Sequence, residues 1–168
     1  ALGGSVNTAS GENSYAFGVR STATKIGQYA FGCWIGQQAG LMVLKADTTD
    51  ATPKAMASNN NAAGNANQLI LPNNAAYAFH GTIVARQKAG DGTACAAFKV
   101  EGLIRREGSA GTTVLVNSAT TVIDNTPSWG MALSADTTNG ALKIQVTGAS
   151  STNVKWTAQI HSAEITYA

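Results

Sequence analysis

The sequence contains few charged residues and no long apolar run. Only 12% of its 168 residues are Asp, Glu, Lys or Arg, roughly half the usual share of globular proteins. No run of eighteen consecutive apolar residues occurs, so we expect no membrane insertion. The formal net charge of +2 is small and its charges are scattered, so we expect no nucleic-acid partner.

Cysteine and helix-forming patterns are also scarce. Cys33 and Cys95 lie far apart, without metal-type spacing or a nearby histidine, which excludes zinc ribbons and Cys-x-x-Cys redox sites. We expect no cofactor and predict both cysteines to be small buried strand residues, while a disulfide between them remains open. The abundance of Gly, Thr, Asn and Ser favours short strands and tight turns over helices.

A 14-residue repeat is the clearest internal signal near the N-terminus. Tyr15-Ala16-Phe17-Gly18 recurs as Tyr29-Ala30-Phe31-Gly32, and Ala9-Ser10 recurs as Ala23-Thr24. So short a period is typical of a solenoid, in which each coil buries one or two side chains. We predict the Ala and Phe positions of each copy to be buried. Two coils cannot close a core alone, so we expect either more coils upstream or other chains around a shared axis.

The pattern divides the chain into three parts. Residues 1–36 are predicted to form a β-roll stem, residues 37–74 an irregular neck or connector, and residues 75–168 an antiparallel β-sandwich head. The abrupt start at Ala1-Leu2 suggests a piece cut from a longer protein. The connector is uncharged over much of its length, which favours packing onto a neighbour over a solvated tail. Within it, Leu41-Met42-Val43-Leu44 is a candidate buried strand.

The head is predicted from regularly spaced strands separated by turn residues. Six or seven of them at this spacing predict an all-β sandwich, jelly-roll-like in type. Asn139-Gly140 is the strongest hairpin signal. The predicted strands are 68–71, 77–87, 94–107, 112–124, 129–136, 141–148 and 154–167.

Alternation within these strands predicts the core. Trp129 and Trp156 lie in phase with apolar neighbours, so we predict both to be buried. In the last strand, Ile165 and Tyr167 fall on the opposite parity from Trp156. A bulge near Ser162-Ala163 would explain this switch, and so would a strand covered on both faces.

Catalytic patterns are absent. No Gly-x-Ser-x-Gly elbow, Walker loop or His-Glu-x-x-His sequence occurs. His80 and His161 are predicted to be strand-surface residues, and the aspartates to form turns. We therefore expect the chain not to be an enzyme, although carboxylates could meet across subunits of an oligomer.

Four residues are candidates for binding. Trp34 ends the repeat and is free of the alternation that places the other tryptophans in the core. Arg105 and Arg106 precede Glu107 at a strand end, where they are predicted to form a solvated edge; the alternative is that they bind acidic sugars. Asp91 lies in a Gly-rich turn.

Two stretches of the sequence resemble known protein families. Residues 9–18 and their second copy resemble the left-handed parallel β-roll repeats of trimeric autotransporter adhesin heads, which also occur in bacteriophage tailspikes and fibres. A longer stretch is similar to C-terminal domains of tailed-phage fibre, spike and other virion appendage proteins. This second resemblance rests on residues 79–86, 98–105, 133–136, 146–148 and 154–158.

The resemblances imply a homotrimeric rod tip, exposed on a virion as tail fibre or tailspike. Such a tip would attach the phage to a bacterial cell-surface glycan or an outer-membrane receptor. One alternative is a purely structural trimerisation and capping module, or a capsid-surface fibre. A bacterial trimeric adhesin and a fragment of a polysaccharide depolymerase are the others.

Overall fold

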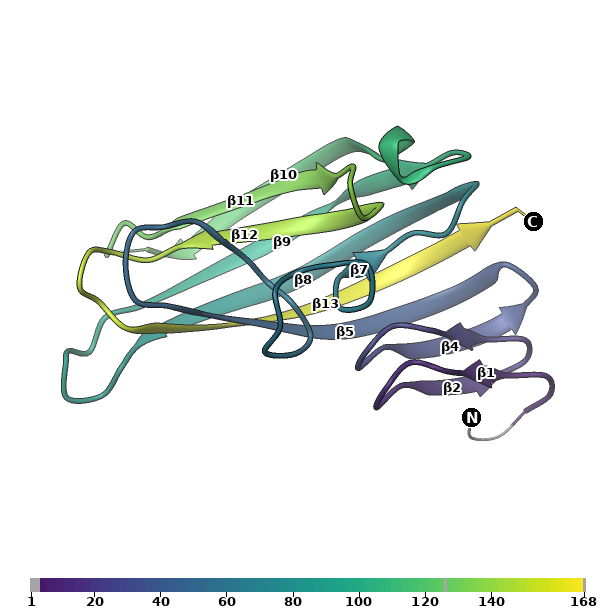
Figure 1. Ribbon diagram of the computed structural model, residues 1–168, viewed down its shortest axis with the longest axis horizontal. Coiled ribbons are helices and arrows are strands. Elements are labelled where there is room, and N and C mark those ends of the chain that lie inside the picture. Colours follow the sequence, from purple (N-terminus) through teal and green to yellow (C-terminus); the bar gives the residue numbers. More distant parts are fainter. Residues whose placement is uncertain (1–3, 126, 168) are drawn as a thin grey trace.

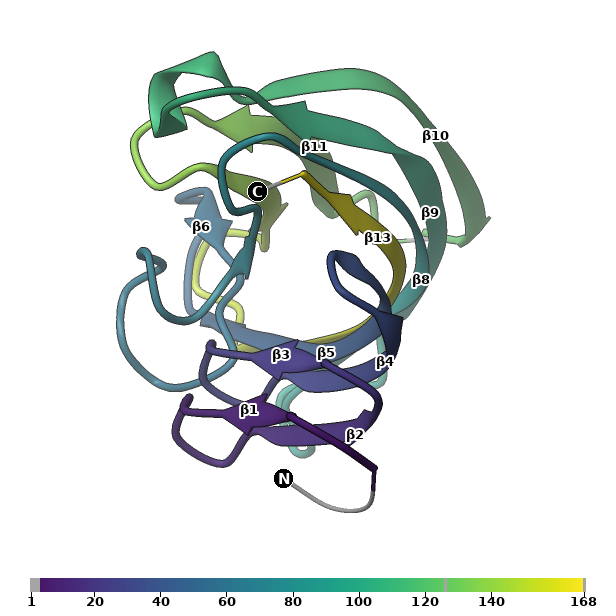
Figure 2. The same ribbon diagram turned by 90° about the vertical axis from the view of Figure 1, so that its right-hand side faces the viewer.

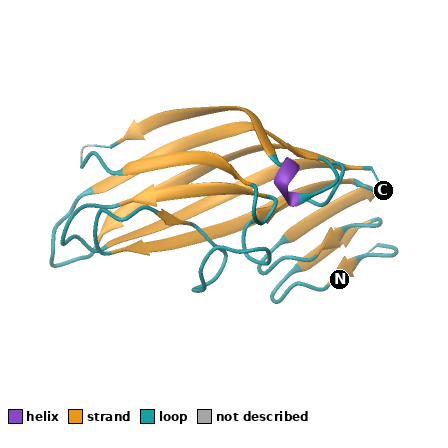
Figure 3. Ribbon diagram, turned by 45° about the horizontal axis from the view of Figure 1, so that its top comes forward, coloured by secondary structure: helices purple, strands orange, loops and turns teal. Residues whose placement is uncertain are grey.

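The computed structural model describes residues 4–125 and 127–167, so the first three residues of the predicted stem lie outside it. The described chain is built of strands and loops, and its one helical element is the short 3-10 helix η1 (Ala110–Thr112) (Figure 3). The predicted all-β fold is confirmed. The described part contains no helix that is long and apolar enough to cross a membrane.

A seven-stranded sheet, the main sheet, forms the larger layer. Its long strands pair antiparallel, with β8 and β13 in unbroken register. Viewed from the end, the sheet curves into an arc (Figure 2). Its strand order is β10 (Val114–Asp124), β9 (Cys95–Arg106), β8 (Ala75–Gln87), β13 (Val154–Thr166), β5 (Gln37–Thr48), β4 (Tyr29–Trp34) and β2 (Tyr15–Gly18).

A smaller sheet lies against the inner face of the arc and closes the core. It consists of β11 (Gly130–Asp136), β12 (Ala141–Thr147) and β6 (Lys54–Ala55), with β7 (Leu69–Ile70) pairing to β12. Trp129 and Trp156 are buried between the layers as predicted, with ring centroids 5.7 Å apart. The Trp156 indole N–H donates to Thr48 Oγ1 at 3.0 Å, so its polar atom is satisfied in the core.

The repeat forms stacked parallel strands with the predicted 14-residue step. Tyr15 pairs with Tyr29 in β2 and β4, and Thr8 pairs with Thr22 in β1 (Thr8–Ala9) and β3 (Thr22–Ala23). Strand β4 then turns and pairs antiparallel with β5. The coils therefore extend the main sheet at one end of the molecule (Figure 1).

The predicted burial of the repeat phenylalanines is wrong. Of the apolar residues described in the repeat, only Ala16, Ala23 and Ala30 are buried, whereas Phe31 is 47% exposed. The coil is too narrow for larger side chains, since even a Cβ added at Gly32 would lie 2.6 Å from the Ser21 Cβ. The aromatic rings instead stack outside, with centroids 5.2 Å apart for Phe17 and Phe31 and 4.9 Å apart for Tyr15 and Tyr29.

The predicted irregular connector begins later than residue 37. Residues 37–48 are the 12-residue strand β5, which pairs with β13 along its whole length. Its inner positions include Gly40, Ala46 and Thr48, which contrast little with their outward neighbours and hide the alternation. Outside β6 and β7, residues 49–74 are irregular, and the Asn67 side chain holds part of this segment together by bonding to Asn59 Oδ1 at 2.8 Å and Ala62 O at 2.9 Å.

Two further local predictions are wrong. Strand β13 contains no bulge, because it pairs in continuous register on both sides, and Ser162 and Glu164 simply continue its buried face. Ile165 lies on the outer face, so the strand is not covered on both faces there. The two cysteines are exposed and not bonded to each other, because each falls on an outward or terminal strand position.

Candidate functional site

Outward-facing residues of the main sheet line up in rows that cross five strands. One row joins Leu41, His161, His80, Glu101 and Ala119 as successive cross-strand partners. The next row joins Val43, Gln159, Thr82, Lys99 and Thr121. Because side chains alternate between the two faces, these rows stand on the side opposite the core.

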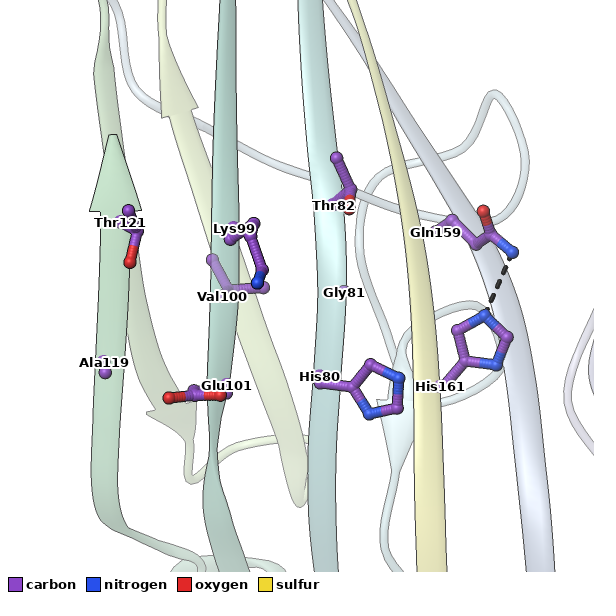
Figure 4. Close-up of a pocket in the computed structure, with 10 residues that line it drawn as sticks. All are labelled: His80, Gly81, Thr82, Lys99, Val100, Glu101, Ala119, Thr121, Gln159 and His161. Carbon is purple, nitrogen blue, oxygen red and sulfur yellow. Dashed lines mark hydrogen bonds between the residues drawn. The ribbon is translucent and has the colours of Figure 1, made fainter. Parts of the chain in front are cut away.

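The residues of the two rows on β13, β8, β9 and β10 line a hollow of about 370 Å³ on the outer face. Figure 4 shows its polar groups, which come from β8, β9, β10 and β13. The imidazoles of His80 and His161 stack with centroids 5.2 Å apart and planes within 8°. Gln159 Nε2 and His161 Nε2 lie 3.0 Å apart, at hydrogen-bonding distance. The pair of rings is thereby fixed on rigid backbone.

An apolar hollow of about 440 Å³ adjoins the polar one and shares its two histidines. Its wall is a row of small side chains, Ala39, Ala163 and Ala78, which are cross-strand partners. Phe31 closes the row at the repeat. We call the two hollows together the outer groove.

The outer groove offers several kinds of polar group without a metal site. Lys99 and Glu101 bring opposite charges, and Thr82, Thr121 and Gln159 bring hydroxyl and amide groups. Among the described residues, no cluster of three or more His, Cys, Asp or Glu side chains could hold a metal ion. The arrangement suits a ligand that is rich in hydroxyls and has apolar faces.

The structure separates the four residues predicted to bind. Trp34 is 58% exposed, and the Arg20 guanidinium lies 5.6 Å from its ring centroid. Arg105 is exposed in an ion pair with Glu107. The predicted sheet edge is wrong, because β9 pairs on both sides there, through Val114 and Ala76 as partners of Arg105. Arg106 points to the opposite face and is partly buried.

The fourth candidate, Asp91, lies at the other end of the sheet, in the loop after β8. Its Oδ2 accepts a hydrogen bond from Asn153 Nδ2 at 3.3 Å. None of the four candidates lines the outer groove.

The histidines of the groove were identified only as surface residues, and their exposed and partly exposed positions confirm that. Their pairing depends on β8 lying beside β13, strands whose paired residues are about eighty positions apart in the sequence. No local pattern reveals it.

Of the aspartates predicted to form turns, Asp50 and Asp136 do so, whereas Asp47 is a strand residue of β5 that pairs with Lys155 and forms an ion pair with Lys45. Asp50 Oδ1 accepts the Thr52 N–H at 2.7 Å, and this hydrogen bonding lowers the pKa of Asp50. Asp136 Oδ1 accepts the N–H groups of Thr138 and Asn139, both at 3.0 Å. Burial raises the pKa of Asp136, but the hydrogen bonds outweigh it and leave the pKa below its usual value.

Comparison with solved structures returns bacteriophage tailspikes. The tailspike gp49 of Acinetobacter baumannii bacteriophage Fri1, a capsular polysaccharide depolymerase, matches 88% of this chain and 25% of its own length, with 13% identity and a TM-score of 0.41. The tailspike of Acinetobacter phage vB_ApiP_P1 matches 73% of this chain and 21% of its own (13% identity, TM-score 0.35). That of A. baumannii phage AM24 matches 74% and 26% (10% identity, TM-score 0.39).

This chain thus spans about a quarter of the length of the tailspikes it matches. No protein-family model matches the chain, and no curated protein matches it. The prediction that the chain is not an enzyme is contradicted by the Fri1 protein, which is a depolymerase, and we do not retain it.

Proposed function

We propose that this chain is part of a tailed-phage appendage, a tail fibre or tailspike, that attaches the virion to a glycan on the bacterial surface. The observation that carries the proposal is the outer groove, where polar side chains adjoin an apolar trough on one rigid sheet.

The chemistry of the groove matches that of a sugar chain. A sugar ring carries hydroxyls around its rim and C–H groups on its faces. The imidazole, amide and hydroxyl groups around His80 can bond the rim, while the alanine row and Phe31 can contact the faces. Because these groups stand on paired strands, little ordering is needed when a ligand binds.

We further propose that the chain assembles as a homotrimer. Strand β10 is the edge strand of the main sheet: in the described chain it pairs with β9 on one side only, and ten of its 11 residues are exposed. Its exposed residues include Val114, Val116, Val122 and Ile123. A long edge of this kind is a template for contact with another chain. Because Ala119 and Thr121 of the groove lie on β10, the groove would border the subunit boundary.

Assembly would make weak single sites sufficient. Three grooves on one rigid tip engage a repetitive polysaccharide at once, which multiplies the affinity of one groove. In this proposal the repeat (residues 1–36) is the stem, and residues 75–168 together with β5 are the head, joined by what remains of the connector.

The test is binding of the purified protein to a panel of bacterial surface polysaccharides, with its mass in solution measured alongside. We expect a mass of three chains, and a loss of affinity of about tenfold or more when His80 and His161 are both changed to Ala. Thr157→Ala is the matched control, since Thr157 is exposed on the same face of β13 outside the groove.

Three results would separate the alternatives. A structural module would be favoured if the protein is a trimer that binds no polysaccharide, and if deleting this region from the appendage abolishes the assembly of the appendage. Release of oligosaccharides in the same assay would favour a depolymerase fragment. A monomer would contradict the assembly.

A further inference from the structure

A cavity of about 410 Å³, separate from the outer groove, lies where the second coil of the repeat meets the main sheet. We call it the junction cavity. The coil contributes Arg20, Lys25 and Gln28, and the sheet contributes Gln38, Tyr77 and Arg106. Its volume falls within the range of small-molecule sites, about 300–1,000 Å³. None of its lining residues belongs to the outer groove.

Three cationic side chains converge on the junction cavity without a carboxylate partner. Among the described residues, Arg20, Lys25 and Arg106 form no ion pair. Burial lowers the pKa of Lys25, and the positive charge of Arg106 lowers it further, so the two cations lie close enough to repel. A site with this excess of positive charge attracts an anion.

Arg106 is held with hydrogen-bonding capacity unused. Its Nη1 donates to Leu71 O at 2.7 Å, while its Nε is buried and has no partner. Gly140 leaves room for the guanidinium, since a Cβ there would lie 2.3 Å from Nη1. Because Nε is enclosed by protein, the guanidinium N–H groups left for a ligand are those of Nη1 and Nη2 that Leu71 O does not occupy.

The nearby carboxylate is committed elsewhere. Glu164 is buried beside the cavity, where Ser162 Oγ donates to its Oε1 at 2.6 Å and Gln38 Nε2 donates to its Oε2 at 2.7 Å. Tyr77 also bonds to Glu164. These three donors occupy the carboxylate, and in the described part of the chain no ion pair joins Glu164 to Arg20, Lys25 or Arg106.

The remaining lining is mixed polar and apolar. The Gln28 amide oxygen accepts the N–H groups of Thr24 and Lys25 at 2.9 and 3.1 Å, and its amide nitrogen makes no bond within the described chain although the residue is 93% buried. Ile70, Leu71 and Pro72 form an apolar wall. A bare inorganic anion would leave this wall and amide unused.

We propose that the junction cavity binds an acidic sugar residue, with its carboxylate between Arg106 and Lys25 and its ring against the wall of Ile70 and Leu71. This inference rests on the proposed glycan-binding function and specifies the glycan as an acidic one, recognised at a site separate from the outer groove. Arginine favours such a carboxylate because its planar fork bonds both oxygens.

The test uses the protein in its natural assembly state, with glucuronate as the probe, glucose as its neutral counterpart and sulfate as a bare anion. Binding is followed by ligand-observed NMR and titration calorimetry. We expect glucuronate to bind, and to bind more tightly than either glucose or sulfate. We expect Arg106→Gln to weaken glucuronate at least about tenfold. Arg105→Gln is the matched control, because it removes the same charge from the neighbouring outward position and should leave the affinity unchanged.

Lys25→Gln gives a second variant in case Arg106→Gln disturbs packing against Gly140, and it should also weaken glucuronate. Equal effects of Arg105→Gln and Arg106→Gln, or sulfate binding as tightly as glucuronate, would overturn the proposal. A third result would also overturn it: glucuronate fails to bind, and Lys25→Gln changes the mass of the assembly. In that case a carboxylate of a neighbouring subunit would occupy the cavity.

The two proposals fail separately. Changing His80 and His161 should lower polysaccharide affinity and leave glucuronate binding intact. If glucuronate does not bind while the polysaccharide does, only the acidic-sugar site is overturned. If glucuronate binds through Arg106 and no polysaccharide binds, the site survives and the attachment function fails.

Discussion

The repeat and the main sheet share one set of paired strands but are stabilised differently. The main sheet covers a core that contains Trp156, Met42 and Ile160, whereas the buried apolar residues described in the repeat are Ala16, Ala23 and Ala30. Three methyl groups bury little apolar area, so the repeat depends on its backbone ladder, its outer aromatic stacks and its attachment to the sheet. We therefore expect stability to differ along one continuous sheet, lower in the repeat than in the long strands.

The largest expected effect is in the main core. Trp156→Ala should lower the free energy of unfolding by about 3–5 kcal/mol, because it leaves a cavity and removes the partner of Thr48 Oγ1. Urea denaturation followed by circular dichroism at fixed protein concentration measures it. Trp34→Ala, at an exposed position, should change the value by no more than about 0.5 kcal/mol. Equal losses would mean that the core does not dominate stability.

An intermediate effect is expected in the repeat. Gly18 has a φ of +87°, and a Cβ there would lie 2.2 Å from Gly32 O, so Gly18→Ala should cost about 1–3 kcal/mol locally. Hydrogen exchange should become faster in residues 8–34 and stay unchanged in β8 and β9. Gly90→Ala is the control, since Gly90 has a similar φ of +93° with nothing nearby. If exchange rises in both regions together, they unfold as one unit.

The smallest effect concerns the seam between the two regions, where Gln38 bonds to both Thr22 and Glu164. Burial raises the pKa of Glu164 above its ordinary value of 4.5, despite hydrogen bonds that lower it. The unfolded carboxyl therefore loses its proton at lower pH than the folded one, and stability should fall as pH rises from about 4.5 through the folded pKa. Glu164→Gln should flatten this fall in pH-dependent melting. A parallel slope in both proteins would show that the decline has another source.

Strand positions in the second half of the chain could be predicted because large apolar residues such as Phe98 and Ile144 alternate with polar ones. The sequence pattern predicts only residues 41–44 of strand β5, because alanine, glycine and threonine occupy much of its inner face. The end of β13 was misread because Ser162 and Glu164 are polar yet buried, and their mutual hydrogen bond is visible only in three dimensions.

The candidate sites were harder to predict than the strands. The alternation of side chains along β9 predicts that Arg105 and Arg106 lie on opposite faces of the sheet. It does not predict the junction cavity, where the residues that lie near Arg106 come from the repeat, far away in the sequence. The outer groove likewise needs the register between β8 and β13. Sites built from neighbouring strands depend on topology, which a single sequence specifies only weakly.

The in-register coils of the repeat have a consequence for how such a protein can change length. Each coil adds one strand to the edge of the main sheet, an increment of about 4.8 Å. An insertion of fourteen residues would keep alanine inside and the aromatic rings in their columns, whereas an insertion of thirteen would turn every later alanine of the coil outward. The reach of the molecule can therefore be adjusted in whole coils, while the outer groove keeps its shape.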